Sequence, residues 1–230
     1  MKKLASLFLT LMLLLSCLAA AEAPEVITAF VTISDGTGTL VMAHVPVLVS
    51  DADADGALTI ADALACAHAA CHPEGAAAFA AEPTQYGLSM TRLWGVENGG
   101  SYGYCVNDAS AWSLVDPIAA GDHIKAYAYT DLVAWSDTYS YFDVTTLSTS
   151  PDQGVTLTLS ANGYDEAWNP VTLPVAGATL TVNGEPTDVV TDEAGRATLT
   201  FAEPGICVVS AVSEAMTLVP PVCIVTVEAE

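Results

Sequence analysis

Hydrophobic and polar residues alternate along most of the chain, a pattern that is typical of β-strands with one buried face. In the first part of the chain the alternation predicts strands over residues 25–34, 39–50, 101–108 and 119–130. The Asp35-Gly36-Thr37-Gly38 segment predicts a hairpin turn between the first two of these strands. The sequence therefore favours a sheet that begins with a hairpin.

Apolar residues recur at helical spacing in one segment. Ile60, Leu64, Ala67 and Cys71 recur on one face and predict a single helix that ends before Pro73. Strands surround this helix on both sides in the sequence. The fold class expected is mainly β with one principal helix (α+β).

The amino-acid composition of the chain changes near residue 146. Residues 146–154, TLSTSPDQG, are rich in Ser, Thr, Pro and Gly and predict a linker. Beyond it, short alternating segments are separated by Asn-Gly, Asp-Glu-Ala-Gly and Glu-Pro-Gly turns. Such spacing is typical of an immunoglobulin-like β-sandwich, here over residues 155–230.

The N-terminus has the layout of a secretory signal peptide over residues 1–21. Lys2 and Lys3 precede an apolar run, and small residues follow it. An alternative is a lipid anchor at Cys17, in the sequence Leu-Leu-Ser-Cys. The apolar run is too short for a permanent transmembrane span. We expect an extracytoplasmic protein, secreted or attached to the cell surface.

Charge excludes one class of function. The chain has 27 Asp and Glu against 5 Lys and Arg, a formal net charge of -22, so it would repel the phosphates of nucleic acids. Hydrophobic residues make up 52% of the chain and charged residues only 14%, which is ample for buried cores. An acidic protein outside the cytoplasm attracts divalent cations.

The segment DADADGALTIAD, residues 51–62, has the spacing of an EF-hand calcium loop. Calcium prefers six to eight oxygen ligands, supplied by loop positions 1, 3, 5, 7, 9 and 12, with Gly at position 6. Gly56 occupies position 6, and Leu58 at position 8 is expected to pack inward. The ligands predicted for calcium are Asp51, Asp53, Asp55, the carbonyl of Ala57, Thr59 and Asp62.

With Asp at its last position, this loop resembles that of dockerin modules, although a dockerin carries two such loops. Residues 25–145 as a whole resemble the β-grasp domain related to the C-terminal domain of transcobalamin, found in bacterial surface proteins. The motifs that carry this second resemblance are Leu93-Trp94-Gly95, Gly103-Tyr104-Cys105-Val106-Asn107 and Ala120-Gly121-Asp122-His123-Ile124. The resemblance implies a β-grasp-like domain with the calcium loop inserted before its helix.

Five cysteines follow Cys17, an odd number. A hairpin turning near Ala215 would set Cys207 opposite Cys223, and we predict a cross-strand disulfide there. Cys66 and Cys71 lie too far apart on a helix to pair with each other. Cys71 with Cys105 is a possible second disulfide.

The segment Cys66-x4-Cys71-His72 allows an alternative, because Cys-x4-Cys-His resembles a variant attachment motif of multihaem cytochromes. His72 would then bind the iron of a c-type haem in a redox protein. His68 and His72 could instead share a transition metal. We favour a simpler interpretation, a helix end that carries two histidines and no haem.

No nucleophile elbow, zinc-protease motif, phosphate loop or dinucleotide fingerprint occurs, so we expect no enzyme. Aromatic residues alternate with small polar ones from Trp135 to Phe142, which suggests a face for sugar or protein contact. The function predicted is binding, adhesion or display, stabilised by calcium, with an extracellular protein or glycan as the partner. A purely structural surface module is a further alternative.

Overall fold

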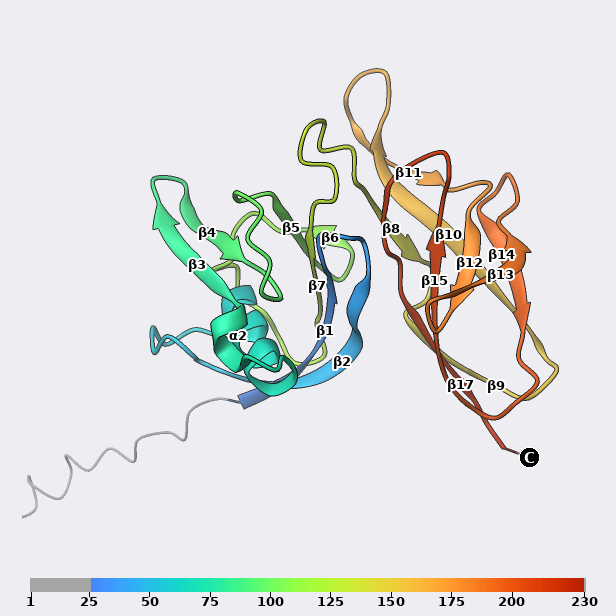
Figure 1. Cartoon of the computed structure of the whole chain (residues 1–230), viewed down its shortest axis with the longest axis horizontal. Coiled ribbons are helices and arrows are strands. Elements are labelled where there is room, and N and C mark those ends of the chain that lie inside the picture. Colours follow the sequence, from blue (N-terminus) through green and yellow to red (C-terminus); the bar gives the residue numbers. More distant parts are fainter. Residues whose placement is uncertain (1–25, 230) are drawn as a thin grey trace, which may run out of the picture.

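The computed structural model of the protein describes residues 26–229. The predicted signal peptide and the candidate lipid anchor at Cys17 lie outside this range. Within it the fold is mainly β with one α-helix, built as two units (Figure 1). No helix in residues 26–229 is long and apolar enough to cross a membrane.

The first unit contains a five-stranded sheet in the order β2-β1-β7-β5-β6. Its central strands β1 and β7 are parallel, with Phe30 opposite His123, and the other neighbours are antiparallel. The bounds are β1 (Val26–Ser34), β2 (Leu40–Ser50), β5 (Tyr102–Val106), β6 (Ala109–Ser110) and β7 (His123–Ala128). The two strands predicted first, and the hairpin between them, are thus present.

Helix α2 (Ile60–Cys71) packs on one face of this sheet, as Figure 1 shows. It begins at Thr59 with a capping box, in which the Thr59 hydroxyl accepts the Asp62 N–H and the Asp62 carboxylate accepts the Thr59 N–H. Its apolar face joins that of β1 in a core, because both carry buried aliphatic residues: Ala29, Val31, Ile33, Ala63, Leu64 and Ala67. The predicted helix is confirmed.

A short 3-10 helix, η1 (Gly75–Ala78), follows α2 and leads into a separate two-stranded hairpin. The hairpin consists of β3 (Ala80–Thr84) and β4 (Gly87–Arg92). It projects from the first unit beside α2 (Figure 1).

The second unit is built from two sheets. One has the order β11-β10-β8-β16 with β14 also paired to β10, and the other has the order β13-β12-β15-β17-β9. The bounds are β8 (Thr138–Phe142), β9 (Thr146–Thr149), β10 (Gly154–Tyr164), β11 (Pro170–Pro174), β12 (Thr179–Val182), β13 (Glu185–Val190), β14 (Arg196–Thr200), β15 (Gly205–Val212), β16 (Leu218–Val219) and β17 (Cys223–Val227).

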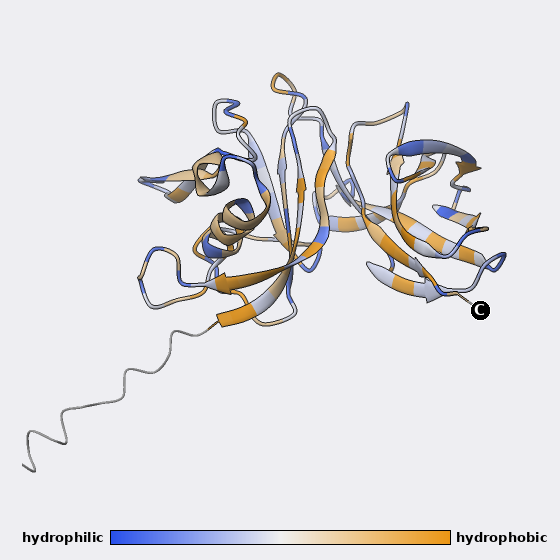
Figure 2. Cartoon of the chain, turned by 60° about the horizontal axis from the view of Figure 1, so that its bottom comes forward, coloured by the Kyte–Doolittle hydropathy of each residue, from blue (hydrophilic) through white to orange (hydrophobic). Residues whose placement is uncertain are grey.

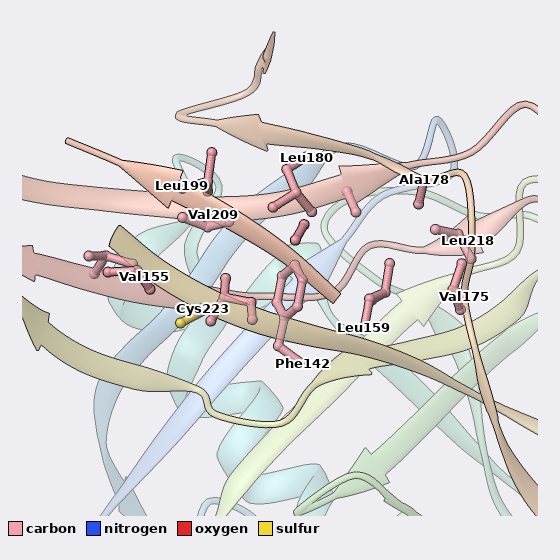
Figure 3. Packing of buried hydrophobic residues seen from close by; sticks show 14 of the residues in the cluster. Phe142, Val155, Leu159, Val175, Ala178, Leu180, Leu199, Val209, Leu218 and Cys223 are labelled. Carbon is pink, nitrogen blue, oxygen red and sulfur yellow. The ribbon is translucent and has the colours of Figure 1, made fainter. Parts of the chain in front are cut away.

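Side chains of both sheets fill a common core (Figure 3). Leu159 comes from one sheet and Leu180 from the other, with Phe142 among them. Figure 2 shows apolar and polar residues alternating along these strands, as expected for strands with one buried face.

The boundary between the units differs from the predicted one. Residues 146–149 of the predicted linker form β9, which pairs in parallel with β17. Strand β8, assigned from the sequence to the first domain, pairs with β10 and β16 of the second unit. The change of composition near residue 146 therefore lies inside the second unit.

The two units meet on the face of the first sheet that is opposite α2. Alternation places Cys105 of β5 and Tyr127 of β7 on this face, where they pack with Tyr139 of β8 and Val219 of β16. Buried contacts thus connect the first sheet with β8 and β16.

Candidate metal centre

The acidic loop connects β2, which ends at Ser50, to α2, which begins at Ile60. The structure brings three of its carboxylates together. One carboxylate oxygen from each of Asp51, Asp53 and Asp55 lies within 4.8 Å of the other two, at the surface of the molecule. These are loop positions 1, 3 and 5 of the predicted calcium site.

Main-chain hydrogen bonds shape this part of the loop. Asp51 accepts the N–H groups of Asp55, at 3.1 Å, and of Gly56, at 2.8 Å. Asp55 in turn accepts the N–H of Ala57 at 2.8 Å. Gly56 has a φ of +91°, in the left-handed region that favours glycine, so the sharp bend expected at position 6 is present.

The surroundings in the loop shift the pKa of two of the carboxyl groups. The hydrogen bond from the Gly56 N–H lowers the pKa of Asp51. Desolvation raises the pKa of Asp53, and the charges of Asp55 and Asp62 raise it further against the lowering effect of the Asp55 N–H. A cation bound between them would relieve this repulsion.

Thr59 and Asp62 have a second role in the structure. The Asp62 carboxylate, which is buried, accepts the Ala52 N–H at 2.7 Å and the Thr59 N–H at 2.9 Å. It also accepts the Thr59 hydroxyl at 2.6 Å. Both side chains therefore fasten the loop to the start of α2, and the described carboxylates that cluster at the surface are the other three.

The available donors are carboxylate and carbonyl oxygens, a set that suits hard divalent cations such as calcium or magnesium and not softer metals. Asp51, Asp53 and Asp55 would hold the ion, with the Ala57 carbonyl as the next oxygen along the loop. These oxygen ligands are thus chemically suited to the predicted calcium ion.

The cysteines and histidines of α2 point in different directions. Cys66 turns towards β2, with its thiol 3.7 Å from the carbonyl oxygen of Ser50, while Cys71 is exposed. His72 caps the helix and its Nδ1 accepts the Glu74 N–H at 3.0 Å. This arrangement does not favour the haem alternative through Cys66, Cys71 and His72.

His68 is a structural residue. Its side chain is fully buried, its Nδ1 lies 2.6 Å from the Leu64 carbonyl, and its Nε2 accepts the Trp94 N–H at 2.9 Å. The neutral ring with its proton on Nδ1 satisfies both contacts. Since both nitrogens are used, His68 has none left for a metal shared with His72.

Neither predicted disulfide is present, and all five described cysteines are free thiols. Cys207 lies opposite Val225, and Cys223 opposite Val209. The register differs from the predicted one because the chain between β15 and β17 passes through β16 of the other sheet, so the two strands are not joined by a tight hairpin.

The Cys71–Cys105 pairing is also wrong. Cys105 is buried on the face of the first sheet that contacts the second unit. Cys71 lies at the end of α2, which packs against the opposite face. Neighbouring residues of β5, such as Tyr104, point to the helix side, so the alternation of the strand separates the two thiols.

A buried lysine between the two units was not singled out from the sequence. Lys125 is 2% exposed, its Nζ donates to the Ser140 carbonyl at 2.6 Å, and it lies 4.5 Å from the centre of the Tyr139 ring. Burial lowers the pKa of Lys125 to about 8, against the opposing charges of Asp108 and Cys105. Its place in an alternating strand gave no signal, because a lysine there is ordinarily exposed.

No protein-family model matches the chain, and comparisons with curated proteins and with solved structures also found no match.

Proposed function

We propose that the protein is a non-catalytic binding or display protein of the extracytoplasmic space, stabilised by one calcium ion in the loop 51–62. The observation that carries the metal site is the gathering of Asp51, Asp53 and Asp55 within 4.8 Å of one another. Three adjacent carboxylates repel each other, and a divalent cation is the simplest partner that turns this repulsion into attraction.

The fold proposed for the first unit is β-grasp-like. A hairpin, a helix across the sheet and a central parallel pair β1·β7 support this assignment. An immunoglobulin-like sandwich is proposed for the second unit, supported by two sheets around one core. Both folds serve in many proteins as carriers of binding surfaces, and fold alone does not identify the ligand.

The proposed ion would act as a brace. The loop joins β2 to α2, and the start of the helix is fixed to another segment, since Ile60 N–H donates to the Asp116 carbonyl and Ala61 N–H to the Leu114 carbonyl. Binding at Asp51, Asp53 and Asp55 would order the remaining part of the connection. Calcium is abundant outside cells, where sites with dissociation constants of roughly 10⁻⁴ to 10⁻³ M are typical.

The test compares the wild type with the triple variant Asp51→Asn, Asp53→Asn, Asp55→Asn, which retains acceptors for the loop's hydrogen bonds and removes its charge. Thermal and urea unfolding would be followed in chelator and in 10 mM calcium. We expect calcium to stabilise the wild type by roughly 1.4 to 2.7 kcal/mol, corresponding to 10 to 100 times the dissociation constant. In chelator the variant should be the more stable protein, because its repulsion is gone.

Asp165→Asn is the matched control, because exposed Asp165 also accepts several loop N–H groups but stands outside the cluster. This variant should keep the full response to calcium. Equal stability of the wild type in chelator and in 10 mM calcium would show that the loop is a solvated turn without an ion.

A further inference from the structure

A second surface feature lies away from the acidic loop, where the β3–β4 hairpin meets the segment that follows β6. A groove with a volume of about 510 Å³ is present here, within the roughly 300–1,000 Å³ typical of small-molecule sites. Its lining includes Thr84, Tyr86, Ser89, Tyr104, Trp112 and Ser113. The two sides are close, since a Cβ on Gly87 would lie 3.6 Å from the Ser113 hydroxyl.

Two of the lining aromatic side chains are almost completely exposed. Trp112 is 96% exposed and Tyr86 is 90% exposed. Large aromatic side chains contribute strongly to stability when they are buried, so two exposed ones on a single groove contribute nothing to the core. In the run for which the sequence suggested a contact face, Tyr139 and Phe142 are buried, while Trp135 is exposed.

Ordered turns hold both aromatic residues. The Asp116 carboxylate accepts the N–H groups of Trp112, at 2.8 Å, and Ser113, at 3.1 Å. The Thr84 hydroxyl accepts the Tyr86 N–H at 3.1 Å and donates to the Gly87 carbonyl at 2.8 Å. Because the backbone is already fixed, a ligand would lose little affinity to ordering these turns.

The polar groups in the groove are uncharged. The chain contains 27 acidic residues, yet the lining includes no Asp, Glu, Lys or Arg and instead offers hydroxyl groups and the Gln85 amide. A charged ligand would find no counter-ion here. The chemistry that matches is a neutral molecule with flat apolar faces for the aromatic rings and hydroxyl groups for the polar side chains.

We propose that this groove binds a neutral oligosaccharide, with Trp112 and Tyr86 stacking against sugar rings. Pyranose rings present C–H faces to aromatic rings and hydroxyl groups at their edges. Hydroxyls of Ser89 and Ser113 and the Gln85 amide are placed to donate to or accept from those edges. The assignment rests on the proposed binding function and names the class of its ligand.

The experiment uses the full mature chain, loaded with calcium, and a set of neutral hexasaccharides: β-1,4-linked glucose, mannose, xylose and N-acetylglucosamine oligomers. Oligogalacturonate serves as the acidic probe. Binding would be measured by isothermal titration calorimetry and by the change in tryptophan fluorescence. We expect at least one neutral oligomer to bind and Trp112→Ala or Tyr86→Ala to weaken that binding at least tenfold.

Trp168→Ala is the matched control, because Trp168 is 81% exposed on the β10–β11 connection, away from the groove lining. It should leave affinity unchanged. Binding of none of the neutral oligomers, a preference for oligogalacturonate, or a loss of affinity in Trp168→Ala equal to that in Trp112→Ala would each overturn the assignment.

The same measurements separate this assignment from the calcium brace. If no sugar binds but calcium still raises the unfolding temperature, the groove assignment fails and the brace stands. If a neutral oligomer binds to the triple Asn variant and calcium has no effect on the wild type, the groove assignment stands and the brace fails.

Discussion

At the scale of single residues, the clearest effect of the fold on chemistry is at His68. Burial lowers its pKa to about 4. In the unfolded chain a histidine has a pKa near 6.5, so the unfolded state takes up a proton between about pH 6.5 and 4 that the folded state does not. The stability that neutral His68 contributes is therefore present above pH 6.5 and lost as the pH falls towards 4.

This gives a prediction for His68→Gln. The variant should be less stable at pH 7, since a glutamine cannot bond to both the Leu64 carbonyl and the Trp94 N–H with the geometry of the ring. As the pH falls from 6.5 to 4.5, the free energy of unfolding of the variant should fall less steeply than that of the wild type. The two slopes should differ by up to about 1.4 kcal/mol per pH unit. Urea unfolding at a series of pH values measures both effects.

Leu64→Ala is the control for a simple loss of packing on the same helix. Leu64 is fully buried, so its truncation should cost roughly 2–5 kcal/mol. It carries no titrating group, and the slope with pH should match that of the wild type. An equal slope in His68→Gln would mean that burial does not perturb this histidine.

At the scale of secondary-structure elements, periodicity predicted β1, β2 and α2 well. Their apolar residues face one core, so tertiary contacts and local pattern agree. The β3–β4 hairpin, which carries Tyr86, was not predicted, because Pro83 interrupts β3 and few of its residues are buried. The groove needs that hairpin beside Trp112, and local pattern contains no such information.

Strand β9 was mistaken for a linker because Ser and Thr dominate it, yet a strand with one exposed face accepts such residues. Leu147 is its partly buried apolar residue and packs against the core of the second unit. Leu147→Ala should therefore lower the stability of that unit by about 1–2 kcal/mol. Ser148→Ala, at the exposed neighbouring position, should change it by less than about 0.5 kcal/mol.

Thermal unfolding of the Leu147→Ala and Ser148→Ala variants measures the difference.

The register of β15 with β17 was missed for a related reason: it depends on the passage of the chain through β16, which no local turn signal reveals. In the acidic loop, by contrast, the clustering of Asp51, Asp53 and Asp55 was predictable, since the spacing of residues within one short loop is a local property. The use of Asp62 in the capping box was not predicted, because its carboxylate has two roles at once. It accepts the Thr59 N–H at the start of the helix and the Ala52 N–H of the loop.

At the scale of the whole molecule, the described part of the chain has few basic groups, and each is engaged internally. Arg92 pairs with Glu97, Arg196 pairs with Asp192, and Lys125 is buried between the units. The surface of residues 26–229 therefore carries an almost unopposed negative charge. Cations are attracted to such a surface and anionic ligands are repelled, in agreement with a calcium brace and a neutral sugar.

Lys125 links this charge balance to the contact between the units. The pKa of Lys125 is lowered to about 8 in the folded protein and is near 10.5 in the unfolded chain. Between about pH 8 and pH 10.5, Lys125 therefore binds fewer protons in the folded protein than in the unfolded chain. Stability from this group therefore rises with pH from about 8 to 10.5. Lys125→Met removes the titration and the cost of burying an ammonium group, so the variant should be the more stable protein at pH 7.

The wild type should then recover about 2 kcal/mol relative to Lys125→Met between pH 7.5 and 10. Tyrosine ionisation in the unfolded chain affects both proteins equally and cancels in the difference. Urea unfolding of both at several pH values gives that difference directly. Parallel curves would show that the amine is not held at the interface in the way the Ser140 and Tyr139 contacts imply.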